Sequence, residues 1–177
     1  MFQDDSVKPV ISVENFHLYY GDFHALKGIA MPILKNQVTS IIGPSGCGKS
    51  TLLRSINRMN DLNRDVRTSG QIFARGKSIY GKNVNLVELR KEVGMVFQRP
   101  NPFPLSVFEN VAFGPRLHFQ LSKRELSNTV QESLTAVGLW EELEDKLHVS
   151  ALTLSSEQQQ RLCIARLLAV NPEVLLM

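Results

Sequence analysis

Apolar residues in the first third of the chain follow the short period of β-strands. The segment 10–18 is rich in apolar residues, and their alternation slips by one position between Val13 and Phe16. The segment 29–33 also alternates, and Pro32 places it at a sheet edge or a bulge because proline has no N–H for a strand ladder. These patterns predict that the first third of the chain consists mainly of strands.

Later apolar runs predict further strands, and the polar residues between them predict loops. The predicted strands are 38–42, 71–74, 79–80, 93–97 and 174–177. A turn at 75–77 joins two of these strands, and the polar segment 60–69 is predicted as a loop. Strands that alternate with helices indicate an α/β fold.

From residue 105 the pattern changes to that of helices. Three segments are typical capping boxes, in which a serine begins a helix and an acidic residue or glutamine follows three positions later; they start at Ser106, Ser122 and Ser155. The helix after Ser122 carries one apolar stripe and stops at Gly138, and the helix after Ser155 breaks at 171–172. We expect about 105–158 to form a helical insertion, and about 1–104 with 159–177 to form a β and P-loop core.

The most specific motif is a P-loop of the form G-x-x-x-x-G-K-[ST] between the predicted strand 38–42 and a helix. It consists of Gly43, Pro44, Ser45, Gly46, Cys47, Gly48, Lys49, Ser50 and Thr51. The glycines let the backbone approach phosphate closely, and the N–H groups at the helix start attract an anion. Lys49 suits the β- and γ-phosphates, Ser50 suits Mg²⁺, and Thr51 suits the α-phosphate region. The motif predicts ATP or GTP binding rather than an ordinary glycine turn.

Composition limits the other classes of function. The 177 residues are 43% hydrophobic and 21% charged, with a net charge of +3 and no basic run, so nucleic acid is not an expected partner. No apolar run approaches the roughly 20 residues that span a bilayer, and residues 1–5 are not a secretory signal. Cys47 is either an oxidation-sensitive group at the nucleotide site or simply a small loop residue, and Cys163 is expected in the core.

Several stretches together resemble the nucleotide-binding subunit of an ABC transporter. Gln98 follows Lys49 by 49 residues at the end of a predicted strand, and LTLSSEQQQRLCIAR precedes the last apolar strand. Within that family, RSINRMNDL, MVFQRPNPFP, ENVAFG and QQQRLCIAR are most similar to the ATP-binding subunits of bacterial phosphate importers. The resemblance covers essentially the whole chain. It implies an α/β P-loop NTPase fold of the ABC type, with an N-terminal antiparallel β subdomain and a helical subdomain insertion.

The resemblance also implies roles for particular residues. Tyr20, with Tyr19 as the next candidate, would stack on the adenine ring. Gln98 would contact Mg²⁺ and the attacking water as the catalytic residue, and Ser50 would share the metal. The signature position, LSGGQ in the family, would reach the ATP of the other subunit in a head-to-tail homodimer; here it holds Leu154, Ser155, Ser156, Glu157 and Gln158. Two membrane-spanning permease subunits, and indirectly a periplasmic or extracellular solute-binding protein, would complete a transporter at the cytoplasmic face of the membrane.

Two departures from the family pattern qualify this interpretation. Both signature glycines are replaced, and Glu157 puts a carboxylate where a partner's γ-phosphate would dock. Two unit charges ~4 Å apart repel by roughly 4 kcal/mol at an effective dielectric constant of 20. In the family, the last apolar strand leads into an aspartate and a glutamate, and a histidine follows later. The sequence stops at Met177 and contains none of the three. The alternative hypothesis is therefore a truncated module that binds ATP without hydrolysing it; a soluble ABC ATPase of DNA repair or translation and a P-loop kinase fit the pattern less well.

Overall fold

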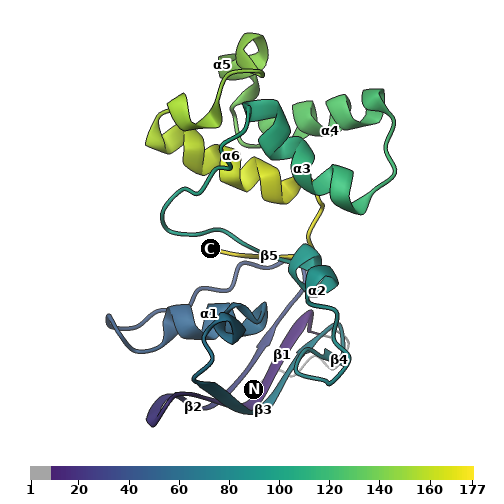
Figure 1. Cartoon of the computed structure of the whole chain (residues 1–177). Helices are drawn as coiled ribbons and strands as arrows, with labels where there is room; N and C mark the ends of the chain where they lie inside the picture. The colour runs from purple at the N-terminus through teal and green to yellow at the C-terminus, as the bar shows by residue number, and fades with distance from the viewer. Residues whose placement is uncertain (1–8) are drawn as a thin grey trace. The chain divides into compact units, whose positions relative to one another are not determined.

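The computed structural model describes residues 9–177, so the predicted absence of a secretory signal in residues 1–5 lies outside the described residues. The chain divides into two compact units, one up to Arg90 and one from Lys91 onward, and each is described by itself. Figure 1 labels most of their elements. The first unit contains β1 (Ile11–Tyr20), β2 (Phe23–Ile33), α1 (Lys49–Ile56), η1 (Met59–Leu62), β3 (Val66–Ala74) and β4 (Lys77–Ser78). Helix α2 (Leu86–Glu92) crosses the division. The second unit contains β5 (Val93–Met95), α3 (Val107–His118), α4 (Lys123–Ala136), α5 (Trp140–Leu143), η2 (Glu144–Lys146), η3 (Ala151–Thr153), α6 (Ser156–Leu168) and β6 (Val174–Leu176).

The first unit is built on a four-stranded antiparallel sheet in the order β2-β1-β3-β4. Strand β2 lies at the edge, as Pro32 predicted, and Pro32 pairs with Ser12 of β1. The edge position tolerates Pro32 because one side of an edge strand needs no ladder partner. The predicted antiparallel β subdomain is therefore confirmed.

A β-bulge in β1 explains the slip in its apolar alternation. Between Val13 and Phe16, β1 carries one more residue than either neighbouring strand, and Asn15 adopts a left-handed φ of 43°. Gly70 of β3 passes the bulge at a φ of 80°, where an added Cβ would lie only 2.1 Å from the Asn15 carbonyl oxygen. Because of the extra residue, Val13 and Phe16 both point to the buried face of the sheet, and both are almost fully buried.

Three predictions of strand or loop in the first unit are wrong. The segment 38–42 forms no strand, and Val38 and Ile42 are 97% and 93% exposed. An apolar run forms a strand only where a neighbour pairs its N–H and C=O groups, and no strand in the described residues pairs with this one. Residues 66–69, predicted as loop, extend β3 because their backbone pairs with β1. No strand forms at 79–80; β4 lies two residues earlier, at Lys77–Ser78, and begins inside the predicted turn 75–77.

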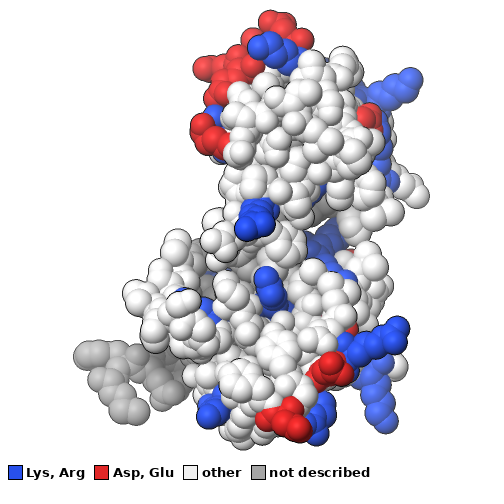
Figure 2. Space-filling model, turned by 60° about the vertical axis from the view of Figure 1, so that its left-hand side comes forward, with Lys and Arg blue, Asp and Glu red and all other residues white. Residues whose placement is uncertain are grey.

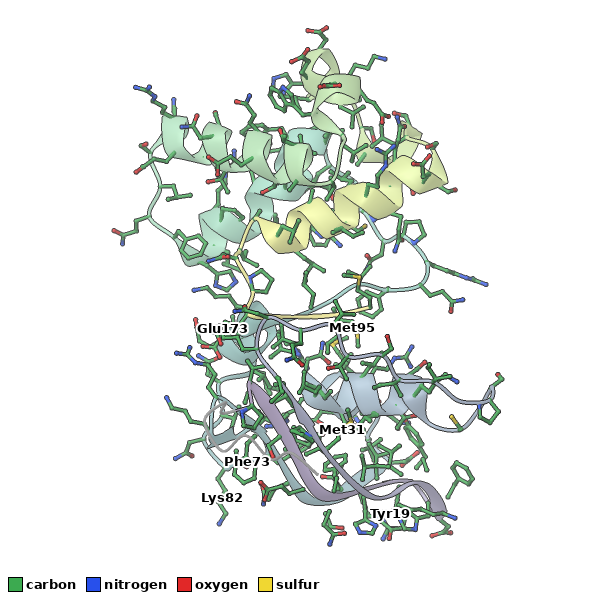
Figure 3. The ribbon with its side chains drawn as sticks, turned by 180° about the vertical axis from the view of Figure 1, so that it is seen from behind. Tyr19, Met31, Phe73, Lys82, Met95 and Glu173 are labelled. Carbon is green, nitrogen blue, oxygen red and sulfur yellow. The ribbon has the colours of Figure 1, made fainter. Side chains whose placement is uncertain are left out.

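Helices α3, α4 and α6 pack together in the second unit, and β5 pairs in parallel with β6. These two strands lie within the predicted strands 93–97 and 174–177. Met95, labelled in Figure 3, is the last residue of β5 and pairs with Leu176. The helical core consists of Val107, Val111, Ala112, Leu126, Val130, Leu134, Leu139, Leu143, Ala151, Leu162, Ala165 and Ala169. Cys163 is buried as expected. Since α6 contributes to this core, it stabilises the helices before it; the predicted division at residues 104 and 158 stays a prediction.

Side chains at the helix ends explain where the helices begin. Ser122 and Ser155 both form complete capping boxes, with Glu125 and Gln158 respectively, as predicted. Ser106 forms half of one: its Oγ accepts from the backbone N–H of Glu109, whose carboxylate instead pairs with Arg116. The competing arginine on the same helix therefore removes the second half of this predicted box.

The charged surface differs from one end of the second unit to the other. Figure 2 shows acidic side chains gathered at the end that carries α5 and η2. Helix α5 carries Glu141 and Glu142, and η2 carries Glu144 and Asp145. Among residues 9–177, no helix has the length and apolar character needed to cross a membrane.

Candidate nucleotide-binding site

Within the P-loop, the chain enters helix α1 at a glycine that no other residue could replace without rearrangement. Gly48 is the N-cap of α1 and has a left-handed φ of 101°. A Cβ at this position would lie 2.8 Å from Leu26 Cδ2 and 3.3 Å from the Ala25 carbonyl oxygen. Gly48 therefore lets the loop turn tightly against β2, and α1 begins at Lys49 with its first N–H groups at the end of the loop.

Lys49 folds back onto the carbonyl groups of its own loop. Its Nζ donates to Gly43 O at 2.8 Å and to Pro44 O at 2.7 Å, and it lies 3.8 Å from Cys47 Sγ. Two neutral carbonyls hold the ammonium group where anionic phosphate oxygens would bind it more strongly, since charge-assisted hydrogen bonds are about twice as strong as neutral ones. The loop thus presents a positive charge and backbone donors together.

The rest of the loop is open. Pro44, Ser45, Gly46, Cys47 and Ser50 are exposed, and Gly46 has a left-handed φ of 80° with no atom within 4 Å of an added Cβ. Thr51 is half-buried, and its carbonyl oxygen accepts hydrogen bonds from Ser55 Oγ and Asn60 Nδ2. Such a loop fits Mg²⁺ bound with a triphosphate, because this ion needs few protein ligands and keeps several waters. Among residues 9–177, no group of three or more His, Cys, Asp or Glu side chains could hold a metal ion.

The bulge at Asn15 determines which tyrosine shares a face with α1. Tyr20 lies two residues after Leu18 on the buried face of the sheet, and its hydroxyl reaches Asn60 of η1 at 3.1 Å. Tyr19, labelled in Figure 3, lies on the opposite face, where its ring stacks on His24 with centroids 4.0 Å apart. Without the extra residue in β1, the two tyrosines would exchange faces. The arrangement favours Tyr20 over Tyr19 as the residue beside the P-loop helix.

Asn60 was missed in the sequence because it falls in a polar stretch that predicts an exposed loop. It is only 5% exposed. Its Nδ2 donates to Thr51 O and to Ser55 Oγ, both at 2.9 Å, while its Oδ1 accepts from Tyr20. The motif RSINRMNDL contains Asn60, but nothing in its composition separates a buried asparagine from an exposed one.

Gln98 is exposed at the end of the segment that follows β5 in the second unit. Helix α6 contacts this segment directly, since Gln160 Nε2 donates to Phe97 O at 3.1 Å. Farther along, Arg166 of α6 donates to Asn101 O at 3.2 Å and lies over the Phe103 ring at 4.2 Å. The chain around Gln98 is therefore fixed to the same helix that carries the signature position.

The signature position forms the start of α6, and its own side chains accept hydrogen bonds from backbone N–H groups there. Ser155 Oγ accepts from Gln158 N at 3.2 Å, and Gln158 Oε1 accepts from Ser155 N at 3.2 Å. Leu154 is half-buried against the helical core, and Ser156 is exposed. Glu157 pairs with Arg161 at 3.0 Å. Its position in the first turn of α6 also suits the helix dipole, which favours negative charge there.

Arg161 also pairs with Glu142 at 2.9 Å, and Gln158 Nε2 donates to the same carboxylate at 2.9 Å. These bonds, from Gln158 first and Arg161 second, hold the pKa of Glu142 below its usual value. The structure thus links Tyr20 to the P-loop helix through Asn60 in the first unit. In the second unit it attaches the segment beside Gln98 to α6, the helix that starts at the signature position.

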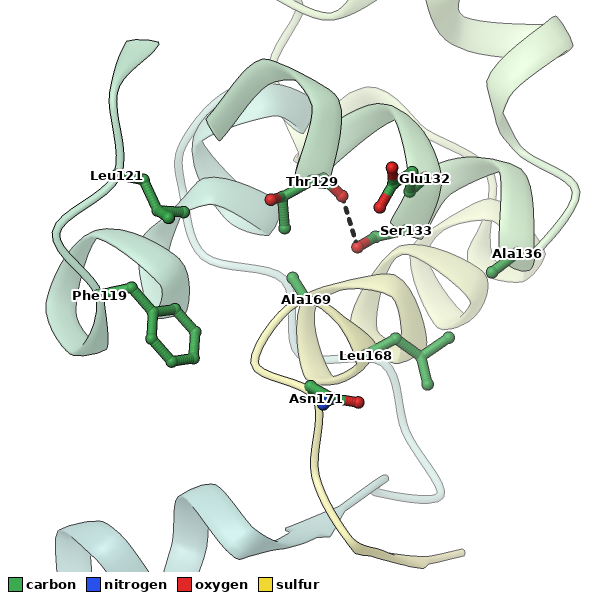
Figure 4. A pocket seen from close by; sticks show the side chains of 9 residues that line it. All are labelled: Phe119, Leu121, Thr129, Glu132, Ser133, Ala136, Leu168, Ala169 and Asn171. Atoms are coloured by element: carbon green, nitrogen blue, oxygen red, sulfur yellow. Dashed lines mark hydrogen bonds between the residues drawn. The ribbon is translucent and has the colours of Figure 1, made fainter. Parts of the chain in front are cut away.

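A groove of about 490 Å³ lies apart from these residues, between α4, the end of α6 and the segment after α3 (Figure 4). Its lining is mostly apolar and consists of Phe119, Leu121, Thr129, Glu132, Ser133, Ala136, Leu168, Ala169 and Asn171. None of the predicted site residues lines it.

Comparison with known proteins identifies the family to which the chain belongs. A family model described as ABC transporter matches residues 26–177. The chain is 55% identical to the phosphate import ATP-binding protein PstB of Thermotoga maritima, over 97% of this chain and 68% of that protein. It is 52% identical to the protein of the same name from Borreliella burgdorferi, over 95% of this chain and 65% of the relative. The chain thus spans about two thirds of the length of these curated relatives.

A solved structure agrees. CbiO1 from Clostridium perfringens, described as part of the ABC transporter complex cbiONQ, superposes with a TM-score of 0.78 and 34% identity over 94% of this chain and 64% of that one. The predicted fold class, a P-loop NTPase of ABC type with an antiparallel β subdomain and a helical insertion, is confirmed. The chain belongs to the ABC transporter family.

Proposed function

We propose that this protein is the ATP-binding and ATP-hydrolysing subunit that energises import of inorganic phosphate by an ABC transporter. The observation that carries the proposal is the P-loop at the start of α1, with Lys49 held between two loop carbonyls. The names of the relatives, which are phosphate import ATP-binding proteins, support phosphate as the solute.

The residues of the first unit would bind the nucleotide. The N–H groups at the start of α1 and the Lys49 ammonium would hold the phosphates, and the Tyr20 ring would stack on adenine. Ser50 and Gln98 would hold Mg²⁺, which would neutralise charge on the phosphate oxygens. Gln98 would also orient the attacking water.

The second unit would supply contacts to partners. In a head-to-tail homodimer, the signature position Leu154–Gln158 would face the ATP that the other copy binds. Two permease subunits would dock on the helical subdomain, for which we propose the bounds 105–158, with 1–104 and 159–177 as the core. A solute-binding protein would deliver phosphate from outside, and this protein would lie at the cytoplasmic face of the membrane.

Phosphate uptake by cells tests the proposal. Cells whose chromosomal copy carries Lys49→Ala should lose uptake of labelled phosphate at low external concentration, because the variant lacks the charge that binds the β- and γ-phosphates. Cells with Lys77→Ala, an exposed lysine of β4 in the same unit, should keep it. Full uptake in the Lys49→Ala cells, with other phosphate importers deleted, would overturn the proposal.

A further inference from the structure

A buried asparagine connects the two halves of the proposed ATP site. Tyr20 and Asn60 are forty residues apart in the chain, and Tyr20 Oη donates to Asn60 Oδ1 at 3.1 Å. From the other end of the same amide, Nδ2 donates to Thr51 O and to Ser55 Oγ, both at 2.9 Å. The side chain therefore links the end of β1 to the first turns of α1.

The partners of Asn60 fix the orientation of its amide. The Thr51 carbonyl only accepts hydrogen bonds, so the nitrogen of the amide must face α1 and the oxygen must face Tyr20. Ser55 strengthens this choice, because its hydroxyl donates to Thr51 O at 2.8 Å and is then an acceptor for Nδ2. Because Asn60 is only 5% exposed, the loss of one of these hydrogen-bond partners is costly. An aspartate would put a second acceptor against Thr51 O, so the position requires an amide.

We propose that Asn60 is a positioning residue that fixes the Tyr20 ring relative to the phosphate-binding start of α1. Thr51 directly follows Lys49 and Ser50, so a bond to its carbonyl ties Tyr20 to the same turn that receives the phosphates. The network would thereby hold the base-stacking ring and the phosphate-binding turn in a fixed relation, which favours ATP over a bare chain of phosphates. This inference rests on the proposed function, because it requires that Tyr20 stacks on adenine.

Calorimetric titration with two ligands tests the inference. Mg-ATP uses both halves of the site, whereas Mg-tripolyphosphate uses only the P-loop. Tyr20→Phe keeps the aromatic ring but removes the bond to Asn60, so it should weaken ATP binding about fivefold, the effect of one hydrogen bond, and leave tripolyphosphate binding unchanged. Asn60→Leu should produce the same selective loss, and the double variant should lose no more than either single one.

Tyr19→Phe is the matched control, because its ring lies on the opposite face of the sheet, and it should bind both ligands like the wild type. Equal losses for both ligands in Tyr20→Phe would overturn the positioning role, because a general structural defect does not discriminate between them. Unchanged ATP binding in Tyr20→Phe would overturn it as well. In either case, ATP binding by the wild-type protein would leave the proposed function intact. Wild-type protein that binds neither ligand would overturn both proposals. Tyr20→Phe decides the matter even if Asn60→Leu fails to fold.

Discussion

Helices α1 and α6 both begin at a place that we propose meets phosphate, yet their first turns are built differently. The N-cap of α1 is Gly48, which offers no side-chain cap, and no acidic residue occupies the first turn. Helix α6 begins with Ser155 and a complete capping box, and Glu157 lies in its first turn. The donors of α1 are therefore left for a ligand, while those of α6 are partly satisfied by the protein itself.

The charges beside the two helix starts reinforce this difference. Lys49 puts a positive charge at α1, bound by two neutral carbonyls and by the Cys47 sulfur. At α6 the carboxylate of Glu157 pairs with Arg161, and Arg161 also pairs with Glu142. Of the two helix starts, that of α1 is therefore the better suited to attract an anion.

Gly48→Ala should have the largest effect, because the new Cβ would meet Leu26 at 2.8 Å in a backbone conformation that alanine avoids. We expect the free energy of unfolding to fall by about 2–3 kcal/mol. Gly46→Ala is the control: its φ of 80° is also left-handed, but no atom lies within 4 Å of the new Cβ. It should cost only about 1–2 kcal/mol. Urea denaturation of the two variants measures both values, and equal losses would contradict a steric role of Leu26.

Replacing Ser156→Gly together with Glu157→Gly should make α6 resemble α1. If the signature position faces a partner's γ-phosphate, removing the carboxylate should raise ATPase activity roughly tenfold, a part of the roughly 4 kcal/mol repulsion between unit charges at ~4 Å. Solvent screening and the ion pair with Arg161 keep the gain below that limit. Ser156→Gly alone is the control and should change the rate little. ATPase assays that find no gain in the double variant would contradict a repulsive role of Glu157.

The smallest effect concerns Glu142, which binds the first turns of α6 from outside the helix. Hydrogen bonds from Gln158 and Arg161 lower its pKa from the usual 4.5. The bonds therefore contribute stability above pH 4.5, and this contribution is lost as the pH falls through the lower pKa of the folded protein. Glu142→Gln should unfold with a weaker dependence on pH in this acidic range than wild type, whereas Glu141→Gln should behave like wild type. Thermal unfolding measured across the acidic range would reveal the difference, and parallel curves for wild type and Glu142→Gln would refute it.

Local patterns predicted the elements whose geometry depends on few residues. The P-loop, the edge position of Pro32 and the slip between Val13 and Phe16 all follow from backbone chemistry that the sequence displays directly. The capping boxes at Ser122 and Ser155 are equally local, because each closes within three residues.

Long-range pairing was not predictable in the same way. Residues 66–69 look like a loop until β1 is present to pair with them, and 38–42 looks like a strand although no neighbour in the described residues pairs with it. Asn60 looks like an exposed asparagine, yet it is buried by partners forty and nine residues away. The candidate site could therefore be located from the sequence at the P-loop, whereas its second half depends on contacts that only the fold brings together.

The extra residue in β1 has a consequence for how this part of the chain tolerates change. Side chains along a strand obey a parity rule: even and odd positions face opposite ways. Val13 is an odd position and Tyr20 an even one, and still they share a face. The reason is that Asn15 adds one residue to β1 that pairs with neither neighbouring strand. Loss of one residue here would leave the composition almost intact and yet turn Tyr20 outward and Tyr19 inward. In this strand, the number of residues carries as much information as their identity.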